Sequence, residues 1–384
     1  MSMMSSKVDP FQHLKLVPNS DGTITRQRDD PPISPSLNPT LPVLTQDATI
    51  NRSNNTFARI FLPREALDSS PSNNLPLVVY FHGGGFVLFS AASDFFHDAC
   101  VNLADDTNSI VVSVEYRLAP EHRLPAAYED AVEALHWIKA QSNDWLRNHA
   151  DFSNCYLMGS SAGANIAYHV GLRVAAELNV YGDNYLAPLK IRGLILSQPF
   201  FGGTKRVPSE VRLVDDPVLP PHVCDLLWEL SLPLGVDRDH EYCNPTAGDG
   251  PVILDRVRQL AWRVLVSGCH GDPLLDHQMA LARLIEEKGV AVVTRFDQGG
   301  CHGIEVRAQR EIKEESENEL FNNVTELKVN NGITVIDAFF VNRVVFVITF
   351  VVIVVVTWER QGSMVVLQDS TQCRCRTSII VDVT

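Results

Sequence analysis

The sequence has 384 residues, a net charge of −14 and a hydrophobic fraction of 45%, which is enough for one large α/β domain with a cap or for two domains. The acidic balance argues against nucleic acid as a partner. The eight cysteines form no Cys-x-x-Cys pair, so the sequence predicts neither a metal site nor a disulfide framework.

The N-terminal region combines prolines with small polar residues. Residues 1–10 lack the apolar core of a signal peptide, which favours a cytoplasmic protein. The prolines between residues 31 and 42 oppose regular helix, so we expect residues 1–45 to form an irregular arm and cap segment, with a short helix around residues 11–17. The alternation over residues 45–62 predicts a strand.

Three consecutive glycines follow a short apolar run at residues 75–81, which predicts a buried strand. These glycines, Gly83, Gly84 and Gly85, let backbone N–H groups turn toward one point because no Cβ obstructs them. Such donors can hold the negative oxygen that forms when an acyl carbonyl is attacked. The alternative is a flexible turn, which the position directly after a strand disfavours. We expect His82 to brace this loop by hydrogen bonds.

Strands and helices alternate through the middle of the chain. We expect further strands at residues 109–116, 154–158, 191–197, 263–268 and 290–296, and helices at residues 126–140, 164–178 and 277–288. This alternation predicts an α/β fold with a mostly parallel sheet covered on both faces. It breaks between residues 200 and 262, a length at which a structureless loop is improbable in a compact domain. We therefore expect a cap inserted at about residues 200–262.

A Gly-x-Ser-x-Gly motif joins the strand at residues 154–158 to the helix that follows. Gly159, Ala162 and Gly163 are small enough for a very tight turn. Such a turn lifts the hydroxyl of Ser161 above the sheet edge, at the positive end of a helix. Ser160 occupies the variable position of the motif. The motif alone is a weak signal, because small residues cluster in many turns.

A serine nucleophile needs a base, and that base needs an orienting carboxylate. Asp272 follows the strand at residues 263–268, and His302 follows the strand at residues 290–296, which gives the chain order serine, acid, histidine. Both positions lie at strand ends, where ligands bind in open α/β sheets. Asp276 is the alternative acid. We expect His270 to lie in a surface loop and His169 to have a structural role.

Five motifs of this sequence together resemble the hormone-sensitive-lipase group of esterases, and most closely plant carboxylesterases. They are His82 to Phe86, Tyr116 to Glu121, Gly159 to Asn165, Asp272 to Leu274 and His302-Gly303. The resemblance spans about residues 8–304. It implies an α/β-hydrolase with helices on both faces of the sheet and a helical cap, in which residues 46–305 form the catalytic domain.

The resemblance implies cleavage of small carboxylic esters without a cofactor, with Ser161, Asp272 and His302 as the catalytic triad. It places the oxyanion donors in Gly83, Gly84 or Gly85, together with Ala162. Three aromatic side chains are expected near the substrate, namely Phe86, Phe200 and Phe201. Gibberellin receptors resemble this group but replace the catalytic histidine, and a plant hydroxyisoflavanone dehydratase has threonine as nucleophile. A small-molecule receptor on a hydrolase scaffold is therefore the alternative function.

The C-terminal tail, residues 306–384, departs from the family pattern. Residues 307–319 are densely charged, whereas residues 338–358 are strongly apolar and approach the length of a membrane span. Two interpretations stay open. The tail is either a C-terminal membrane anchor, which would make the membrane a partner, or non-native sequence such as a gene model that runs past a splice site.

Overall fold

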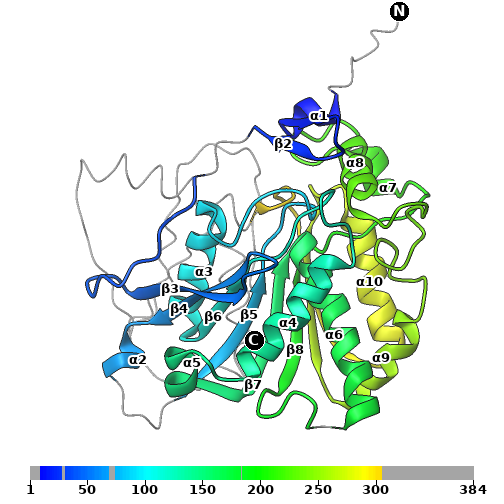
Figure 1. Cartoon of the computed structure of the whole chain (residues 1–384). Coiled ribbons are helices and arrows are strands. Elements are labelled where there is room, and N and C mark those ends of the chain that lie inside the picture. The colour runs from blue at the N-terminus through cyan, green and yellow to red at the C-terminus, as the bar shows by residue number, and fades with distance from the viewer. Residues whose placement is uncertain (1–8, 28–30, 69–73, 183, 305–384) are drawn as a thin grey trace, which may run out of the picture. The chain divides into compact units, whose positions relative to one another are not determined.

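The protein is organised around an eight-stranded sheet with the strand order β10-β9-β8-β7-β5-β6-β4-β3 (Figure 1). The computed structural model describes residues 9–27, 31–68, 74–182 and 184–304. The strands of the sheet are β3 (Val43–Asn51), β4 (Thr56–Pro63), β5 (Leu75–Phe81), β6 (Ile110–Val114), β7 (Ala150–Ser160), β8 (Ile191–Ser197), β9 (Arg263–Cys269) and β10 (Ala291–Asp297). Strands β5 to β10 pair in parallel, and β3 and β4 are antiparallel. The predicted mostly parallel sheet is confirmed.

Helices cover both faces of this sheet, because successive residues of a strand point to opposite sides. Leu77, Val79 and Phe81 of β5 face one apolar cluster, which contains residues of α4 (Ala126–Lys139), α6 (Ala162–Tyr181) and α10 (Leu275–Glu287). Val78 and Tyr80 face a second cluster with α3 (Asp94–Thr107). The core therefore has two apolar layers, one on each face of the sheet.

The expected single strand at residues 45–62 is wrong. The chain forms β3 and β4 there, and the two strands pair as an antiparallel hairpin. The turn between them contains Asn55 in the left-handed region, with a φ of 53°, a conformation that asparagine adopts more easily than most residues. The polar run of residues 51–55 thus ends one strand and starts the next.

The N-terminal arm contains more regular structure than expected. Helix α1 spans only Pro10–His13, and a two-stranded hairpin of β1 (Leu16–Pro18) and β2 (Ile24–Arg26) follows. The helix expected as far as residue 17 ends early because the backbone reverses at Lys15, where φ is 53°. Arg26 fixes the hairpin to the body, since its guanidinium donates to the carbonyl oxygens of Val87 and Ala119 and pairs with Glu121 at 2.7 Å.

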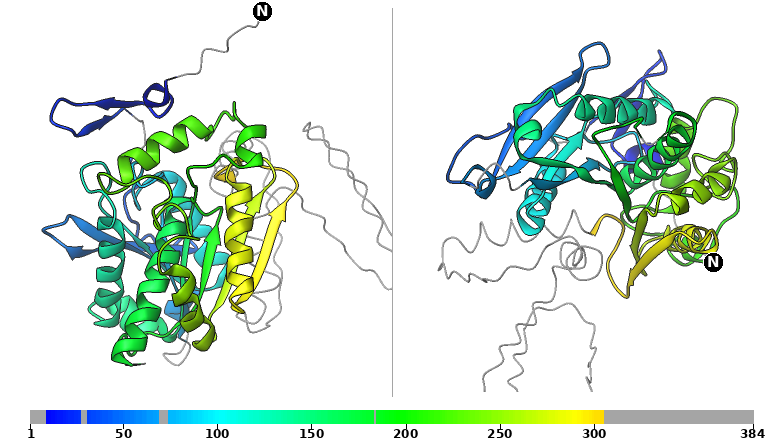
Figure 2. Two further views of the ribbon diagram at one scale, coloured as in Figure 1. Left: turned by 90° about the vertical axis from the view of Figure 1, so that its right-hand side faces the viewer. Right: turned by 90° about the horizontal axis from the view of Figure 1, so that it is seen from below.

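The segment expected as an insertion, about residues 200–262, contains three helices. Helix α7 (Pro208–Arg212) and helix α8 (Pro221–Ser231) precede α9 (Gly250–Gln259). Figure 2 shows α8 beside the N-terminal arm, and the side chain of His13 contacts the carbonyl of Val218 at 3.2 Å. Helix α9 packs instead against α6 and α10. The domain boundaries at residues 45, 200–262 and 305 remain predictions.

Two short helices complete the description, α2 (Glu65–Asp68) and α5 (Asp144–His149). The tail, including the apolar residues 338–358, lies outside the described residues. Within the described residues, every helix is too short or too polar to cross a membrane.

Candidate active site

The turn between β7 and α6 holds Ser161 in a strained conformation. Its φ is 56° and its ψ is −117°, a backbone conformation that residues other than glycine rarely adopt. A Cβ atom on Gly163 would lie 1.9 Å from the carbonyl oxygen of Phe81, and one on Gly159 would lie 2.2 Å from the carbonyl carbon of Gly163. Both flanking glycines are therefore required by close backbone packing, as the sequence predicted.

Ser161, His302 and Asp272 form a continuous hydrogen-bonded line. The Nε2 atom of His302 lies 2.8 Å from the Oγ atom of Ser161, and its Nδ1 atom lies 2.8 Å from the Oδ2 atom of Asp272. Asp272 is fully buried and His302 is 7% exposed. Asp272 lies in the loop after β9, and His302 lies in the loop after β10. These two loops bring together the acid and the histidine that the sequence placed at strand ends.

The carboxylate of Asp272 is surrounded by donors. The backbone N–H of Leu274 donates to Oδ1 at 2.9 Å, and the side-chain amide of Gln278 donates to Oδ2 at 2.8 Å. Hydrogen bonds to a buried carboxylate offset the cost of removing it from water. These bonds also fix the plane of the carboxylate, and hence the ring of His302 that contacts it.

The glycine loop lies against the serine turn. A Cβ atom on Gly83 would lie 3.3 Å from the Cβ atom of Ser161. Gly84 and Gly85 have φ values of 114° and 60°, in a range that glycine adopts more readily than other residues. Among the described residues, the backbone N–H groups of Gly83, Gly84, Gly85 and Ala162 donate to no protein acceptor. Free amides at a turn and at a helix start can bind a negative oxygen.

His82 braces the glycine loop, as expected. Its Nδ1 atom contacts the carbonyl oxygen of Gly83 at 2.8 Å. The side chain is fully buried, and burial lowers the pKa of His82 from 6.5 to about 4. A neutral ring with the proton on Nδ1 therefore donates to Gly83, and the assignment of this tautomer follows from that acceptor.

The alternative acid, Asp276, has a different task. Its Oδ2 atom accepts the backbone N–H of Ser209 at 2.7 Å, and the hydroxyl of Ser209 donates to the carbonyl of Pro273. Asp276 thus holds α7 against the loop that carries Asp272. His270 is exposed, in keeping with the surface position expected for it.

The three aromatic residues expected at the substrate are packed inside the protein. Phe86, Phe200 and Phe201 are at most 1% exposed. The ring of Phe200 stacks on Trp228 of α8 with centroids 4.6 Å apart, and Phe86 lies 5.6 Å from the same indole. Because water cannot reach these rings, they form a packed support for α8, and direct contact with substrate stays a prediction.

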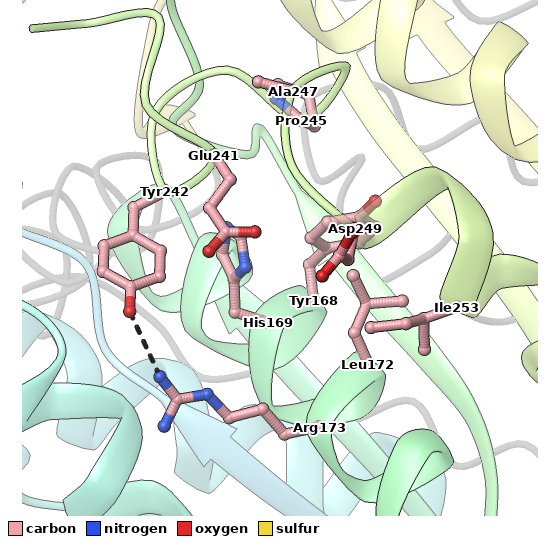
Figure 3. A pocket seen from close by; sticks show the side chains of 11 residues that line it. Tyr168, His169, Leu172, Arg173, Glu241, Tyr242, Pro245, Ala247, Asp249 and Ile253 are labelled. Carbon is pink, nitrogen blue, oxygen red and sulfur yellow. Dashed lines mark hydrogen bonds between the residues drawn. The ribbon is translucent and has the colours of Figure 1, made fainter.

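His169 lines a pocket of about 200 Å³ between α6 and the start of α9 (Figure 3). Its ring is buried against the aromatic rings of Tyr128 and Tyr242, and burial lowers its pKa to about 3. A guanidinium from Arg173 approaches the hydroxyl of Tyr242 at 3.5 Å. His169 is thus a neutral ring in an aromatic cluster, in keeping with the structural role expected for it.

Two residues of the site escaped the sequence analysis. Gln278 lies on the buried side of α10 and donates to Asp272. Gln198 directly follows β8 and contacts the segment on either side of His302. A polar residue placed directly after a predicted strand was the available signal for Gln198, whereas nothing in the helical pattern distinguished Gln278.

Comparisons with known proteins agree with this geometry. Residues 78–306 match a family model described as an alpha/beta hydrolase fold. The chain is 50% identical over 312 residues to carboxylesterase 20 of Arabidopsis thaliana, covering 80% of this chain and 94% of the relative. It is 44% identical over 306 residues to 3-O-acetylpapaveroxine carboxylesterase CXE2 of Papaver somniferum, covering 77% and 93%.

Solved structures give the same result. An esterase of Pyrobaculum calidifontis matches with a TM-score of 0.56 and 26% identity, over 76% of this chain and 86% of that one. The thermostable carboxylesterase EstE1, cloned from a metagenomic library, matches with a TM-score of 0.55 and 25% identity, over 76% and 88%. The chain is therefore a carboxylic ester hydrolase with the α/β-hydrolase fold, and it belongs to the plant carboxylesterases of the hormone-sensitive-lipase group.

Proposed function

We propose that this esterase cleaves small carboxylic esters by a serine mechanism. Ser161 is the nucleophile, His302 is the general base and Asp272 orients His302. The observation that carries the proposal is the line of two 2.8 Å contacts from Ser161 through His302 to Asp272. Contacts of this length are within the reach that a base needs to take the serine proton.

In the first half of the reaction, the Oγ atom of Ser161 attacks the carbonyl carbon while its proton moves to the Nε2 atom of His302. The tetrahedral intermediate then collapses as the ester C–O bond breaks, and His302 gives that proton to the departing alkoxide. The alcohol departs, and the acyl group stays bound to Ser161 as an acyl-enzyme. In the second half, His302 takes a proton from water, and the resulting hydroxide attacks the acyl group. The carboxylic acid departs when His302 returns its proton to Ser161.

The negative oxygen of each tetrahedral intermediate is assigned to the free amides of the glycine loop and of Ala162. Gly83 lies beside Ser161, and Gly84 and Gly85 continue the same loop. Ala162 contributes the first N–H of α6, where the helix dipole also favours negative charge. Donors fixed by the backbone need no rearrangement during the reaction, which is why they stabilise a transition state more than water does.

The test compares two neighbouring serines of the full chain. Ser161→Ala should lower kcat for short-chain nitrophenyl esters by about 10⁴-fold or more. Ser160→Ala removes the adjacent hydroxyl, which accepts from Tyr80 at 3.0 Å, and should keep kcat within about tenfold. Thermal unfolding checks that both variants fold. Full activity of Ser161→Ala would refute the serine mechanism, and tight hormone binding without turnover would favour the receptor alternative.

An acyl-enzyme has its own kinetic signature. Rapid mixing with a nitrophenyl ester should release about one equivalent of nitrophenol per active enzyme before the steady state, provided that deacylation is the slower step. Mass spectrometry after acid quench should then find the acyl group on the peptide that contains Ser161. An acyl group on another residue would contradict the assignment.

A further inference from the structure

The segment Ser197–Phe200 lies between the nucleophile and the histidine and contacts both. Its backbone brackets Ser161, because the carbonyl of Ser197 accepts the N–H of Ser161 at 2.9 Å and the N–H of Phe200 donates to the carbonyl of Ser161 at 3.0 Å. Both the N–H and the carbonyl of Ser161 are thus bonded to this segment, which fixes the position of Ser161 relative to it.

The side chain of Gln198, in the same segment, brackets His302. Its Oε1 atom accepts the backbone N–H of Gly303 at 2.7 Å, and its Nε2 atom donates to the backbone carbonyl of Cys301 at 3.0 Å. These partners are the residues immediately before and after His302. These partners define which way the side-chain amide of Gln198 points. The N–H of Gly303 needs the amide oxygen as its acceptor, and the carbonyl of Cys301 needs the amide nitrogen as its donor.

Gln198 is itself held firmly. It is 3% exposed, and its backbone N–H donates to the carbonyl of Ser267 in β9 at 2.8 Å. Its φ of 43° lies in the left-handed region, which a residue with a side chain adopts only when its surroundings require it. The buried amide makes a further contact to the Sγ atom of Cys269 at 3.2 Å, so both ends of the side chain are occupied.

We propose that Gln198 is a positioning residue that sets the distance between Ser161 and His302. Asp272 contacts the Nδ1 edge of the His302 ring, whereas Gln198 holds the backbone on both sides of that residue. The two bonds from Gln198 fix that backbone relative to the same segment that fixes Ser161. This inference rests on the serine mechanism proposed above, and it extends that mechanism to a residue that does not touch the reacting atoms.

The test uses two substitutions in the full chain. Gln198→Met keeps the length of the side chain but removes both hydrogen bonds, and Gln198→Glu keeps the acceptor for Gly303. We expect Gln198→Met to lower kcat by about tenfold to 100-fold with KM changed by less than about threefold, because misplacement of a catalytic group weakens the chemical step more than binding. Gln198→Glu should fall between Gln198→Met and the wild type.

A stability control separates positioning from folding. Leu194→Ala removes a fully buried side chain from β8, the strand that ends just before Gln198, at a position that pairs with Leu157 of β7 and Val264 of β9. It should lower the unfolding temperature at least as much as Gln198→Met yet retain most of kcat. The rate constant for covalent labelling of Ser161 by an organophosphate gives a second readout, and it should fall in Gln198→Met in parallel with kcat.

The outcomes are distinct. Wild-type kcat and labelling rate in a folded Gln198→Met variant would overturn the positioning role, even if Ser161→Ala is inactive. An equal loss of kcat in Leu194→Ala would also overturn it, because the effect would then reflect stability alone. Full activity of Ser161→Ala would instead refute the serine mechanism itself.

Discussion

The ring of Tyr116 stacks on the ring of His82 with centroids 4.2 Å apart, and its hydroxyl donates to the backbone carbonyl of His82 at 2.9 Å. Both side chains are buried. His82 in turn contacts the carbonyl of Gly83. Tyr116 therefore supports the glycine loop from the strand β6 side, through the residue that precedes the loop.

Tyr116→Phe should keep the stacking and lose the hydrogen bond. The carbonyl of His82 would then be buried without that donor, which costs about 1–3 kcal/mol of unfolding free energy. We also expect kcat to fall a few-fold, because the amides assigned to the oxyanion become less well placed. Chemical denaturation and ester kinetics measure both effects. Tyr181→Phe, at a 67% exposed tyrosine, should change neither, and an unaltered Tyr116→Phe would contradict this role.

Glu115 lies next to this pair and couples stability to pH. Its side chain is 18% exposed and its Oε2 atom lies 3.9 Å from the Nε2 atom of His82. Burial raises the pKa of Glu115 from 4.5 to about 7. The folded state thus binds this proton more tightly than the unfolded state, so the resulting stability is complete below pH 4.5 and is lost as the pH rises to about 7. His82, with its lowered pKa of about 4, contributes stability above pH 6.5 that is lost as the pH falls.

Glu115→Gln isolates the contribution of the carboxylate. The amide oxygen can still accept from Ser90 and from the N–H of Ala91, as Glu115 does at 2.8 Å and 2.7 Å. The unfolding free energy of the wild type, taken relative to this variant, should be higher at pH 5 than at pH 8 by on the order of 2 kcal/mol. Denaturant titrations at both pH values give this difference. Glu286→Gln, at an exposed position, should give no such difference, and a pH-independent result for Glu115→Gln would exclude the coupling.

Local signals explain why much of the fold and site could be predicted. Strands β5, β8 and β9 are short apolar runs, and Ser161, Asp272 and His302 each follow a strand end beside small residues. The structure brings these three side chains together, while their catalytic roles remain a proposal. Helix α3 was missed because four of its 14 residues are Asp, which has a low helix propensity. Its buried Phe96, Cys100 and Leu103 do recur at helical spacing.

The positioning residues could not be predicted in the same way. Gln198 and Cys301 are 103 positions apart in the sequence, and their contact depends on how β8, β9 and β10 align in the sheet. No local pattern reports that alignment. The turn that splits residues 45–62 is a different case, since its run of asparagines was a local signal that the alternation of apolar residues obscured.

The two flanking glycines of the serine turn give a steric prediction. Gly163→Ala would place a methyl group 1.9 Å from the carbonyl oxygen of Phe81, which is backbone and cannot move aside. We expect the turn to be displaced and kcat to fall by at least about 100-fold. Gly299→Ala is the matched control in the His302 loop, because its Cβ would meet nothing within 4 Å. Steady-state kinetics on both purified variants decide the matter, and a fully active Gly163→Ala would show that the turn is less tight than its geometry implies.

The two aspartates after β9 allow the acid of the proposed triad to be tested directly. Asp272→Asn keeps the shape of the side chain but no longer stabilises a protonated His302, and it should lower kcat by about 10⁴-fold. Asp276→Asn changes the carboxylate that accepts the N–H of Ser209, an acceptor that the amide oxygen can replace. We therefore expect kcat to stay within about tenfold, with a small loss of thermal stability as α7 loosens. Parallel measurement of kcat and unfolding temperature separates the two roles, and a larger loss of kcat in Asp276→Asn than in Asp272→Asn would reverse the assignment of the acid.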